Sequence, residues 1–282
     1  MDAINAKACY PEGPLWHRDC LWYVEYAAHR IVRWNGRSNE IFWQEPGSGP
    51  CALAPWGDDF LLCAFDGNAL LRIGADGRTR ARWNRDIDGD GFVGPNDLTP
   101  DGQGGFFFTV SGRFDVEAPI EGAVMHFDPR GQIRCLVDGL HFANGIAFDP
   151  ARRRLHVSEH LAQRILMFDV LAFARLGTRR VFSQLARSAP HDLDRDGYVG
   201  GDGMKLDAEG QLHVAHFGTG RLLTFAPDGG LAGSIDLPMR YPTNLAFGPA
   251  AQGRPPAIYV TAVDDPWHAP YAGAVFHLQP AP

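Results

Sequence analysis

The sequence predicts an all-β protein with the architecture of a six-bladed β-propeller. One phrase recurs along the 282 residues: a turn with an oxygen-bearing residue, an apolar run, an Asp/Gly turn and two further apolar runs. Repeats of about 40–50 residues built from short strands are typical of propellers and arrays. The 33 glycines and 21 prolines are dispersed, as many tight turns require. A β-sandwich is the alternative, but it would not require a repeated phrase.

Six repeats follow one another, beginning at the turn residues Glu12, Cys51, Asn96, Asn144, Asp202 and Asn244. In each repeat the second and third apolar runs have the length and the β-branched or aromatic content of strands. These runs lie at 21–24 and 30–34, 60–63 and 69–73, 105–109 and 122–128, 155–157 and 164–169, 212–214 and 221–225, and 258–260 and 273–278. Each repeat therefore predicts one blade of three or four antiparallel strands, and we expect residues 1–282 to form a single domain.

Two stretches fall outside this scheme. Residues 2–10 are too short to be a repeat. We expect them to supply an outer strand that pairs with the last strand and closes the ring without an exposed edge. Residues 170–176 are the only stretch that looks helical, and it is short.

The composition places the protein among packed, globular proteins. Hydrophobic residues make up 45% and aromatic residues 11% of the chain, while the net charge is -7. An acidic surface gives no support for binding nucleic acid or an anionic membrane. The first residues lack the basic start and apolar core of a signal peptide, and the five cysteines have no paired spacing. We expect a cytoplasmic protein with free thiols, a monomer or weak homo-oligomer, whose partner is a small-molecule substrate.

The six turn residues form the candidate site. Equivalent positions on the blades of a propeller converge on one axis, and five of these six residues carry a side-chain oxygen. Carboxylates and carboxamides are the ligands that a hard cation such as Ca²⁺ or Mg²⁺ prefers. Asn and Asp are also common turn residues that satisfy nearby backbone groups. Their shared register across the repeats favours a metal site on the axis.

At these residues the sequence resembles the senescence marker protein (regucalcin)/gluconolactonase family of six-bladed propellers. The resemblance covers nearly the whole chain and is carried by the segments 11–16, 94–98, 143–148, 201–204 and 243–248. It implies a single divalent metal held by Glu12, Asn144 and Asp202, with Asn96 nearby as a substrate or water contact. Ca²⁺ is the expected ion, with Zn²⁺, Mg²⁺ and Mn²⁺ as alternatives. Many members of this family hydrolyse lactones.

Lactone hydrolysis suits these residue types. A divalent ion can polarise an ester carbonyl and lower the pKa of a bound water, and a carboxylate at the metal can act as general base. We therefore expect a metal-dependent lactonase with Asp202 as ligand and catalytic base. The alternatives are an organophosphate-type hydrolase, a lyase or isomerase on the same scaffold, or a non-catalytic calcium-binding protein.

The sequence lacks some of the polar residues expected at a sugar-lactone site. In the regucalcin branch an Arg stands two residues before the equivalent of Asn96, where this chain has Gly94. A less polar lactone or another ester therefore remains open as the substrate. The region 106–115 and the loop 264–271 could shape an apolar pocket, although Phe106 to Phe108 are better explained as core between blades.

An acidic loop predicts a second calcium site. Asp86, Asp88, Asp90 and Asp97 occupy positions 1, 3, 5 and 12 of a stretch with Gly91 at position 6, which is the ligand spacing of a calcium-binding loop. An acidic, solvated turn is the alternative interpretation. The stretch 192–203 repeats the start of this pattern, but its twelfth residue is glycine.

His191 is the histidine most suited to the site, because it lies in the segment that leads to Asp202. We assign it with Asn96 to substrate binding. No GxSxG or P-loop motif is present, so a serine nucleophile or nucleotide site of those types has no support.

Overall fold

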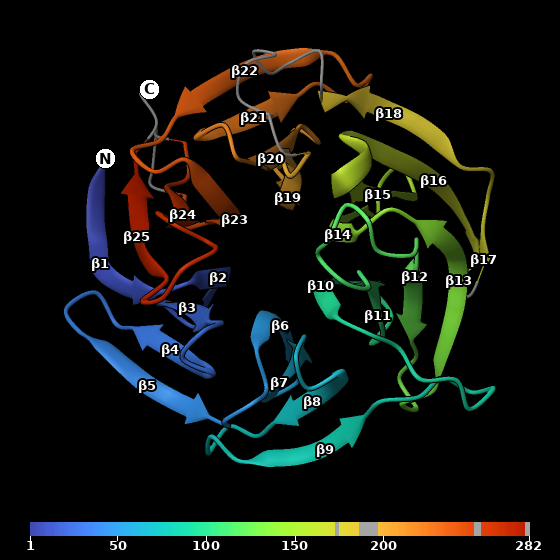
Figure 1. Ribbon diagram of the computed structural model, residues 1–282, viewed down its shortest axis with the longest axis horizontal. Helices are drawn as coiled ribbons and strands as arrows, with labels where there is room; N and C mark the ends of the chain where they lie inside the picture. Colours follow the sequence, from blue (N-terminus) through green and yellow to red (C-terminus); the bar gives the residue numbers. More distant parts are fainter. Residues whose placement is uncertain (173–174, 186–196, 251–254, 280–282) are drawn as a thin grey trace.

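Six antiparallel sheets stand in a ring in the computed structural model of the protein (Figure 1). The structure describes residues 1–172, 175–185, 197–250 and 255–279. Within these residues the regular structure is β-strand, apart from one turn of 3₁₀-helix at His160–Ala162. The prediction of an all-β, six-bladed propeller is confirmed.

Each blade starts with a strand beside the axis and proceeds outward. The first three blades are β2 (Pro11–His17), β3 (Cys20–Glu25), β4 (Arg30–Trp34) and β5 (Asn39–Gln44); β6 (Pro50–Trp56), β7 (Asp59–Ala64), β8 (Ala69–Ile73) and β9 (Thr79–Trp83); and β10 (Pro95–Pro100), β11 (Phe106–Val110), β12 (Gly122–Phe127) and β13 (Ile133–Leu140).

The other three blades follow the same order. They are β14 (Ala143–Asp149), β15 (Arg154–Glu159), β16 (Arg164–Ala172) and β18 (Arg180–Gln184), with β17 (Arg175–Leu176) also on β16; β19 (Gly200–Leu206), β20 (Leu212–Phe217), β21 (Arg221–Phe225) and β22 (Leu231–Asp236); and β23 (Tyr241–Phe247), β24 (Ile258–Val263), β25 (Ala272–Leu278) and β1 (Asp2–Cys9).

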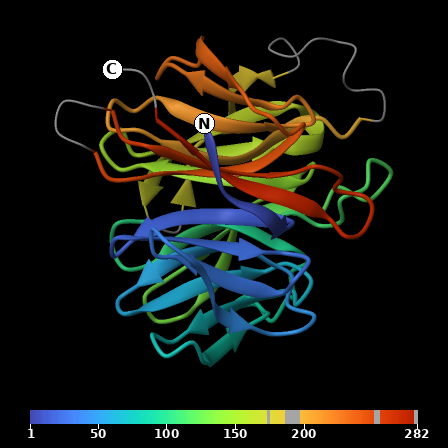
Figure 2. The same ribbon diagram turned by 90° about the vertical axis from the view of Figure 1, so that its left-hand side faces the viewer.

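The ring is closed by the N-terminal strand. β1 pairs with β25 in antiparallel register, from Asp2 opposite His277 to Cys9 opposite Ala272. Figures 1 and 2 show blue β1 beside the red strands of the last blade. The outer edge of that blade is therefore supplied by residues from the other end of the sequence, which confirms the expected closure.

The core is divided into six apolar wedges, one between each pair of neighbouring blades. Phe107 and Phe108 illustrate the division: they are adjacent on β11, point to opposite faces, and belong to the wedges on either side of their blade. This burial on both faces confirms that Phe106 to Phe108 are core residues. It also explains why the strands read as apolar runs rather than as an alternating pattern.

The helical expectation for residues 170–176 is wrong for the residues of this stretch that the structure describes, 170–172 and 175–176. Val170 continues β16 and lies opposite Leu176, and Arg175 lies opposite Ala172. The Val170 side chain is buried in the wedge between the third and fourth blades, so packing of a β-branched residue decides the local structure over an ambiguous apolar pattern. No helix in the described residues is long and apolar enough to cross a bilayer.

Candidate active site

A β-bulge interrupts the innermost strand of every blade at the same height. In β14 the pairing with β15 shifts between Ala143 and Ile146, and in β19 the pairing with β20 shifts between Gly201 and Met204. The same shift occurs in β2, β6, β10 and β23. A bulge adds a residue to one strand and redirects its side chain. Six bulges at one height therefore present six residues to the axis.

The bulges fix which residues are equivalent. Counting from the paired residues on either side, the first bulge position holds Cys51, Asn96, Asn144, Asp202 and Thr243. In β2 the corresponding residue is Glu12, which pairs with Val24 directly before the shift. The sequence alignment placed Asn244 in this set, which is wrong by one residue. Asn244 pairs with Thr261 and occupies the next position, together with Asp97. The connection between β23 and β24 is longer than in the other blades, so counting back from the second strand of the repeat led to the wrong residue.

Five of these six residues line one end of a cavity of about 220 Å³, which we call its floor. Glu12, Asn96, Asn144 and Asp202 all line it, together with Cys51. The structure thus brings together the four residues that the sequence singled out from separate blades. His191 lies outside the described residues.

Buried hydroxyl groups hold the backbone next to three of these floor residues. The carbonyl of Pro11 accepts a hydrogen bond of 2.7 Å from the Thr243 hydroxyl, and that of Ala143 accepts one of 2.5 Å from Ser111. The Ser158 hydroxyl donates in the same way to Gly201. Each acceptor immediately precedes Glu12, Asn144 or Asp202, and each donor comes from the preceding blade. These bonds fix the positions of the three side chains relative to one another.

The two floor carboxylates, Glu12 and Asp202, lie near each other, and their surroundings raise the pKa of both. Burial raises the pKa of Glu12 well above its usual range, and the nearby charges of Asp202 and Asp97 raise it further. Burial likewise raises the pKa of Asp202, which a hydrogen bond from the Asn144 side chain partly offsets. Two neighbouring acids that repel each other favour either a proton or a cation between them.

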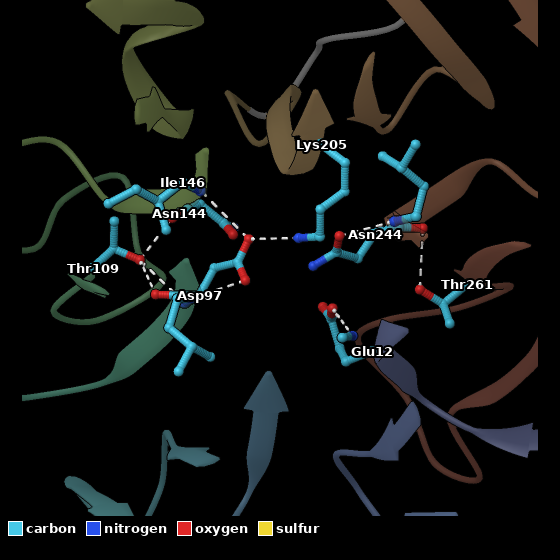
Figure 3. Close-up of polar contacts among 11 residues, drawn as sticks. Glu12, Asp97, Thr109, Asn144, Ile146, Lys205, Asn244 and Thr261 are labelled. Atoms are coloured by element: carbon cyan, nitrogen blue, oxygen red, sulfur yellow. Dashed lines mark hydrogen bonds and ion pairs between the residues drawn. The ribbon is translucent and has the colours of Figure 1, made fainter. Parts of the chain in front are cut away.

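A second group of polar residues lies deeper on the axis. Figure 3 shows Asp97, Lys205 and Asn244 directed toward one another from three blades, with Glu12 of the floor beside them. The buried Asp97 carboxylate accepts a weak hydrogen bond of 3.4 Å from the Ile146 amide and lies 3.5 Å from the Lys205 ammonium. Sequence reasoning missed Lys205. A signal was available, since the equivalent residues Ala54, Ala147 and Ala246 are small and uncharged.

The donor chemistry of the floor fits a hard divalent cation. No three His, Cys, Asp or Glu side chains gather into a metal-binding group within the described ranges. A metal at the floor would therefore take the carboxamide oxygen of Asn144 besides the carboxylates of Glu12 and Asp202. Carboxylate and carboxamide oxygens are the usual ligands of Ca²⁺, and a cation would relieve the repulsion between the two acids.

The predicted calcium loop is split by the structure. Asp86 accepts hydrogen bonds from the amides of Asp88 and Asp90 at 3.0 and 2.9 Å, in the loop between β9 and β10. Asp97 instead belongs to the deeper axial group, paired with Lys205. Calcium binding by Asp86, Asp88 and Asp90 stays a prediction.

Above the floor the cavity wall is aromatic. Tyr10, Tyr26, Phe65, Phe142 and Phe217 line it, and Phe114 and Tyr271 come from the two regions expected to shape an apolar pocket. Sequence reasoning missed Tyr10 because the residue type at its position varies between repeats, where Gly49, Gly94 and Phe142 share its positive φ angle.

Comparisons with known proteins agree with the fold and point to one family. The model of the SMP-30/gluconolactonase/LRE-like region matches residues 10–263. A gluconolactonase from Zymomonas mobilis is 25% identical over 89% of this chain and 77% of its own length.

A diisopropyl-fluorophosphatase from Loligo vulgaris is 26% identical over 68% of this chain, but only 61% of its own length is covered. The crystal structure of a calcium-binding regucalcin from Agrobacterium tumefaciens superposes with a TM-score of 0.78 at 19% identity, covering 96% of this chain and 90% of that one. The latter likeness concerns the fold.

Proposed function

Because the chain belongs to the SMP-30/gluconolactonase/LRE-like family, we propose that it is a lactonase that opens a small lactone with water at the axial cavity. The observation that carries the proposal is the cavity floor, where two carboxylates and two carboxamides from four blades meet. The gluconolactonase from Zymomonas mobilis, which aligns over most of this chain, supports the same activity.

The proposal includes one divalent cation, with Ca²⁺ as the first candidate. Glu12, Asn144 and Asp202 would hold it, for the reasons of donor chemistry given above. When bound, such an ion supplies a Lewis acid for the lactone carbonyl and lowers the pKa of a nearby water. Asn96, on the same floor, is placed to contact the lactone or the attacking water.

Asp202 is the proposed general base. It takes a proton from the attacking water while the water oxygen bonds to the acyl carbon, and it returns that proton to the ring oxygen when the acyl–oxygen bond breaks. The product is the open hydroxy acid. The hydrogen bond from the Asn144 side chain orients the carboxylate.

A second candidate is hydrolysis of phosphofluoridates or phosphotriesters. The similarity to the diisopropyl-fluorophosphatase from Loligo vulgaris favours it, and the same floor residues would serve, since both reactions deliver water to an electrophilic centre next to a polarised oxygen.

A substrate panel separates the two. Initial rates with δ-valerolactone, the acyclic ester ethyl acetate and diisopropyl fluorophosphate are measured by pH-stat in the presence of Ca²⁺. We expect δ-valerolactone to be hydrolysed with the highest kcat/KM. Turnover of diisopropyl fluorophosphate alone would replace the proposal with the second candidate, and no turnover of any compound would reject both.

A further inference from the structure

We propose that the cavity takes lactones carrying an apolar alkyl or aryl substituent, and that polyhydroxylated sugar lactones are poor substrates. This inference rests on the proposed lactonase function and concerns the wall above the floor. Seven aromatic side chains form that wall, and we call them the aromatic collar: Tyr10, Tyr26, Phe65, Phe114, Phe142, Phe217 and Tyr271. No lysine or arginine is among the described residues that line the cavity.

The rings of the collar pack against one another around the cavity. The Phe114 and Phe142 rings are 4.7 Å apart between centroids, and those of Tyr10 and Tyr26 are 5.3 Å apart. Further contacts join Tyr26 to Phe65, Phe65 to Phe142, Phe114 to Phe217 and Tyr10 to Tyr271. A packed set of rings is a preformed apolar surface that needs little reorganisation to bind a ligand.

The collar is kept in place despite backbone strain. Tyr10, Phe142 and Tyr271 have positive φ angles of 48°, 58° and 54°, a region that bulky residues rarely adopt and glycine adopts freely. Main-chain hydrogen bonds hold them there, including one of 2.8 Å from the Tyr10 amide to the Tyr271 carbonyl. Three aromatic residues thus occupy positions where glycine would be less strained, and their rings line the cavity.

Above the floor, the side-chain groups of the described residues that could bind sugar hydroxyls are three tyrosine hydroxyls, of Tyr10, Tyr26 and Tyr271, and the ring of His160. The Tyr26 hydroxyl already donates to Asp66 at 2.9 Å. Each ring hydroxyl of a sugar lactone loses water on entering the cavity and must find a partner there, or affinity falls. An alkyl chain or aryl ring instead buries apolar surface against the collar.

The size of the cavity limits the substituent. A cavity of about 150 Å³ lined by apolar side chains binds benzene, and this cavity measures about 220 Å³. It therefore has room for a six-membered lactone with a short alkyl chain or one fused ring.

Three δ-lactones of matched ring size test the inference: δ-valerolactone without substituent, δ-octalactone with a propyl chain, and D-glucono-1,5-lactone with hydroxyl groups. Each kcat/KM is divided by the hydroxide-catalysed rate constant of the same lactone, which removes intrinsic reactivity. We expect δ-octalactone to exceed δ-valerolactone by at least tenfold and D-glucono-1,5-lactone by at least a hundredfold. Hydrolysis of D-glucono-1,5-lactone as fast as δ-octalactone overturns the inference and leaves the proposed function intact. No hydrolysis of any of the three rejects both.

A variant pair locates the effect in the collar. Phe114→Ala is expected to raise the KM for δ-octalactone at least tenfold and to change kcat/KM for δ-valerolactone less than threefold. The control Phe42→Ala removes a partly buried ring that packs on Trp22 and Phe60 of the first two blades, and should change neither. Equal losses on both lactones in Phe114→Ala would contradict the inference. If Phe114→Ala does not fold, Phe65→Ala makes the same comparison.

Discussion

Three buried hydroxyls decide where the floor carboxylates and the Asn144 amide lie. Ser158, which is fully buried, bonds the carbonyl just before Asp202. Groups that orient metal ligands commonly contribute about 10- to 100-fold to metal affinity. We therefore expect Ser158→Ala to weaken Ca²⁺ binding at the axial site by about that factor in isothermal titration calorimetry, and Ser158→Thr to restore part of it.

A serine away from the axis provides the control for this prediction. Ser234 is exposed on β22, so Ser234→Ala should leave the Ca²⁺ affinity unchanged. An affinity for Ser158→Ala equal to that of Ser234→Ala would show that the hydroxyl bond does not position Asp202.

Single site residues could be predicted from the sequence where they recur at the same place in several repeats. Asn96, Asn144 and Asp202 recur with the strand pattern, so their meeting on the floor could be predicted. Tyr10 could not, because the residue type at its position varies between repeats and includes Gly49 and Gly94. Lys205 stands out against the alanines at equivalent positions, but its partner Asp97 also fits the spacing of a calcium loop, which hid the pair.

The bulged inner strands can pack closely on the axis only because small residues lie next to the floor residues. A Cβ atom at Gly203 would lie 2.0–2.3 Å from the side-chain amide of Asn244, a distance that real atoms do not tolerate. We expect Gly203→Ala to lower the free energy of unfolding by about 1–3 kcal/mol and to reduce lactone hydrolysis, because Asp202 is the preceding residue. Thermal melts and pH-stat rates measure the two effects.

A strand glycine without neighbours serves as the matched control. Nothing lies within 4 Å of a Cβ built at Gly233 in β22. Gly233→Ala should therefore keep both the melting temperature and the activity, and a Gly203→Ala protein that behaves like it would argue against close packing at the bulge.

The closing strand gives a second prediction for the elements. Ala8 of β1 is 1% exposed and packs in the wedge with Tyr23 and Val275, whereas Ala6 of the same strand is exposed. Ala8→Asp would bury an unpaired charge, which costs several kcal/mol, so we expect a large fall in melting temperature. Ala6→Asp should change it little, and similar melting temperatures for the two variants would contradict the role of β1 in closing the ring.

The strands themselves could be predicted from apolar runs and turn residues, but their exact register could not. Asn244 was misplaced by one position because an insert separates β23 from β24, and a register is set by cross-strand pairing that a single strand does not reveal. Val170 and Leu176, from the stretch that looked helical, lie in paired strands and pack in the wedge between the third and fourth blades.

For the molecule as a whole, buried histidines predict how stability depends on pH. Burial lowers the pKa of His156 and of His216 to about 4, while a histidine in the unfolded chain titrates near 6.5. The unfolded state therefore binds protons that the folded state does not, and the free energy of unfolding falls as pH drops from about 6.5 to about 4. The loss is on the order of 3 kcal/mol for each histidine.

Melting temperatures across this pH range check the prediction. His216→Leu should flatten the dependence, whereas His268→Leu, at an exposed side chain, should not. An unchanged slope in His216→Leu would show that this histidine is protonated without loss of the fold.

The six-bladed fold could be predicted from the repeated sequence pattern. Six similar units that each bury two faces must pack side by side and close into a ring. The aromatic collar could be predicted only in part from the sequence, because its rings come from connections that differ from blade to blade. That residues 1–282 behave as one domain stays a prediction.

The proposed function depends on one divalent cation, which Glu12, Asn144 and Asp202 would hold at the floor of the axial cavity. Elemental analysis of wild type and Asp202→Ala after identical dialysis tests it most directly, with δ-valerolactone hydrolysis followed on the same samples. We expect the variant to contain one divalent ion per chain fewer than wild type and to hydrolyse no lactone. Equal metal content in the two proteins, or full hydrolysis by the variant, would contradict it.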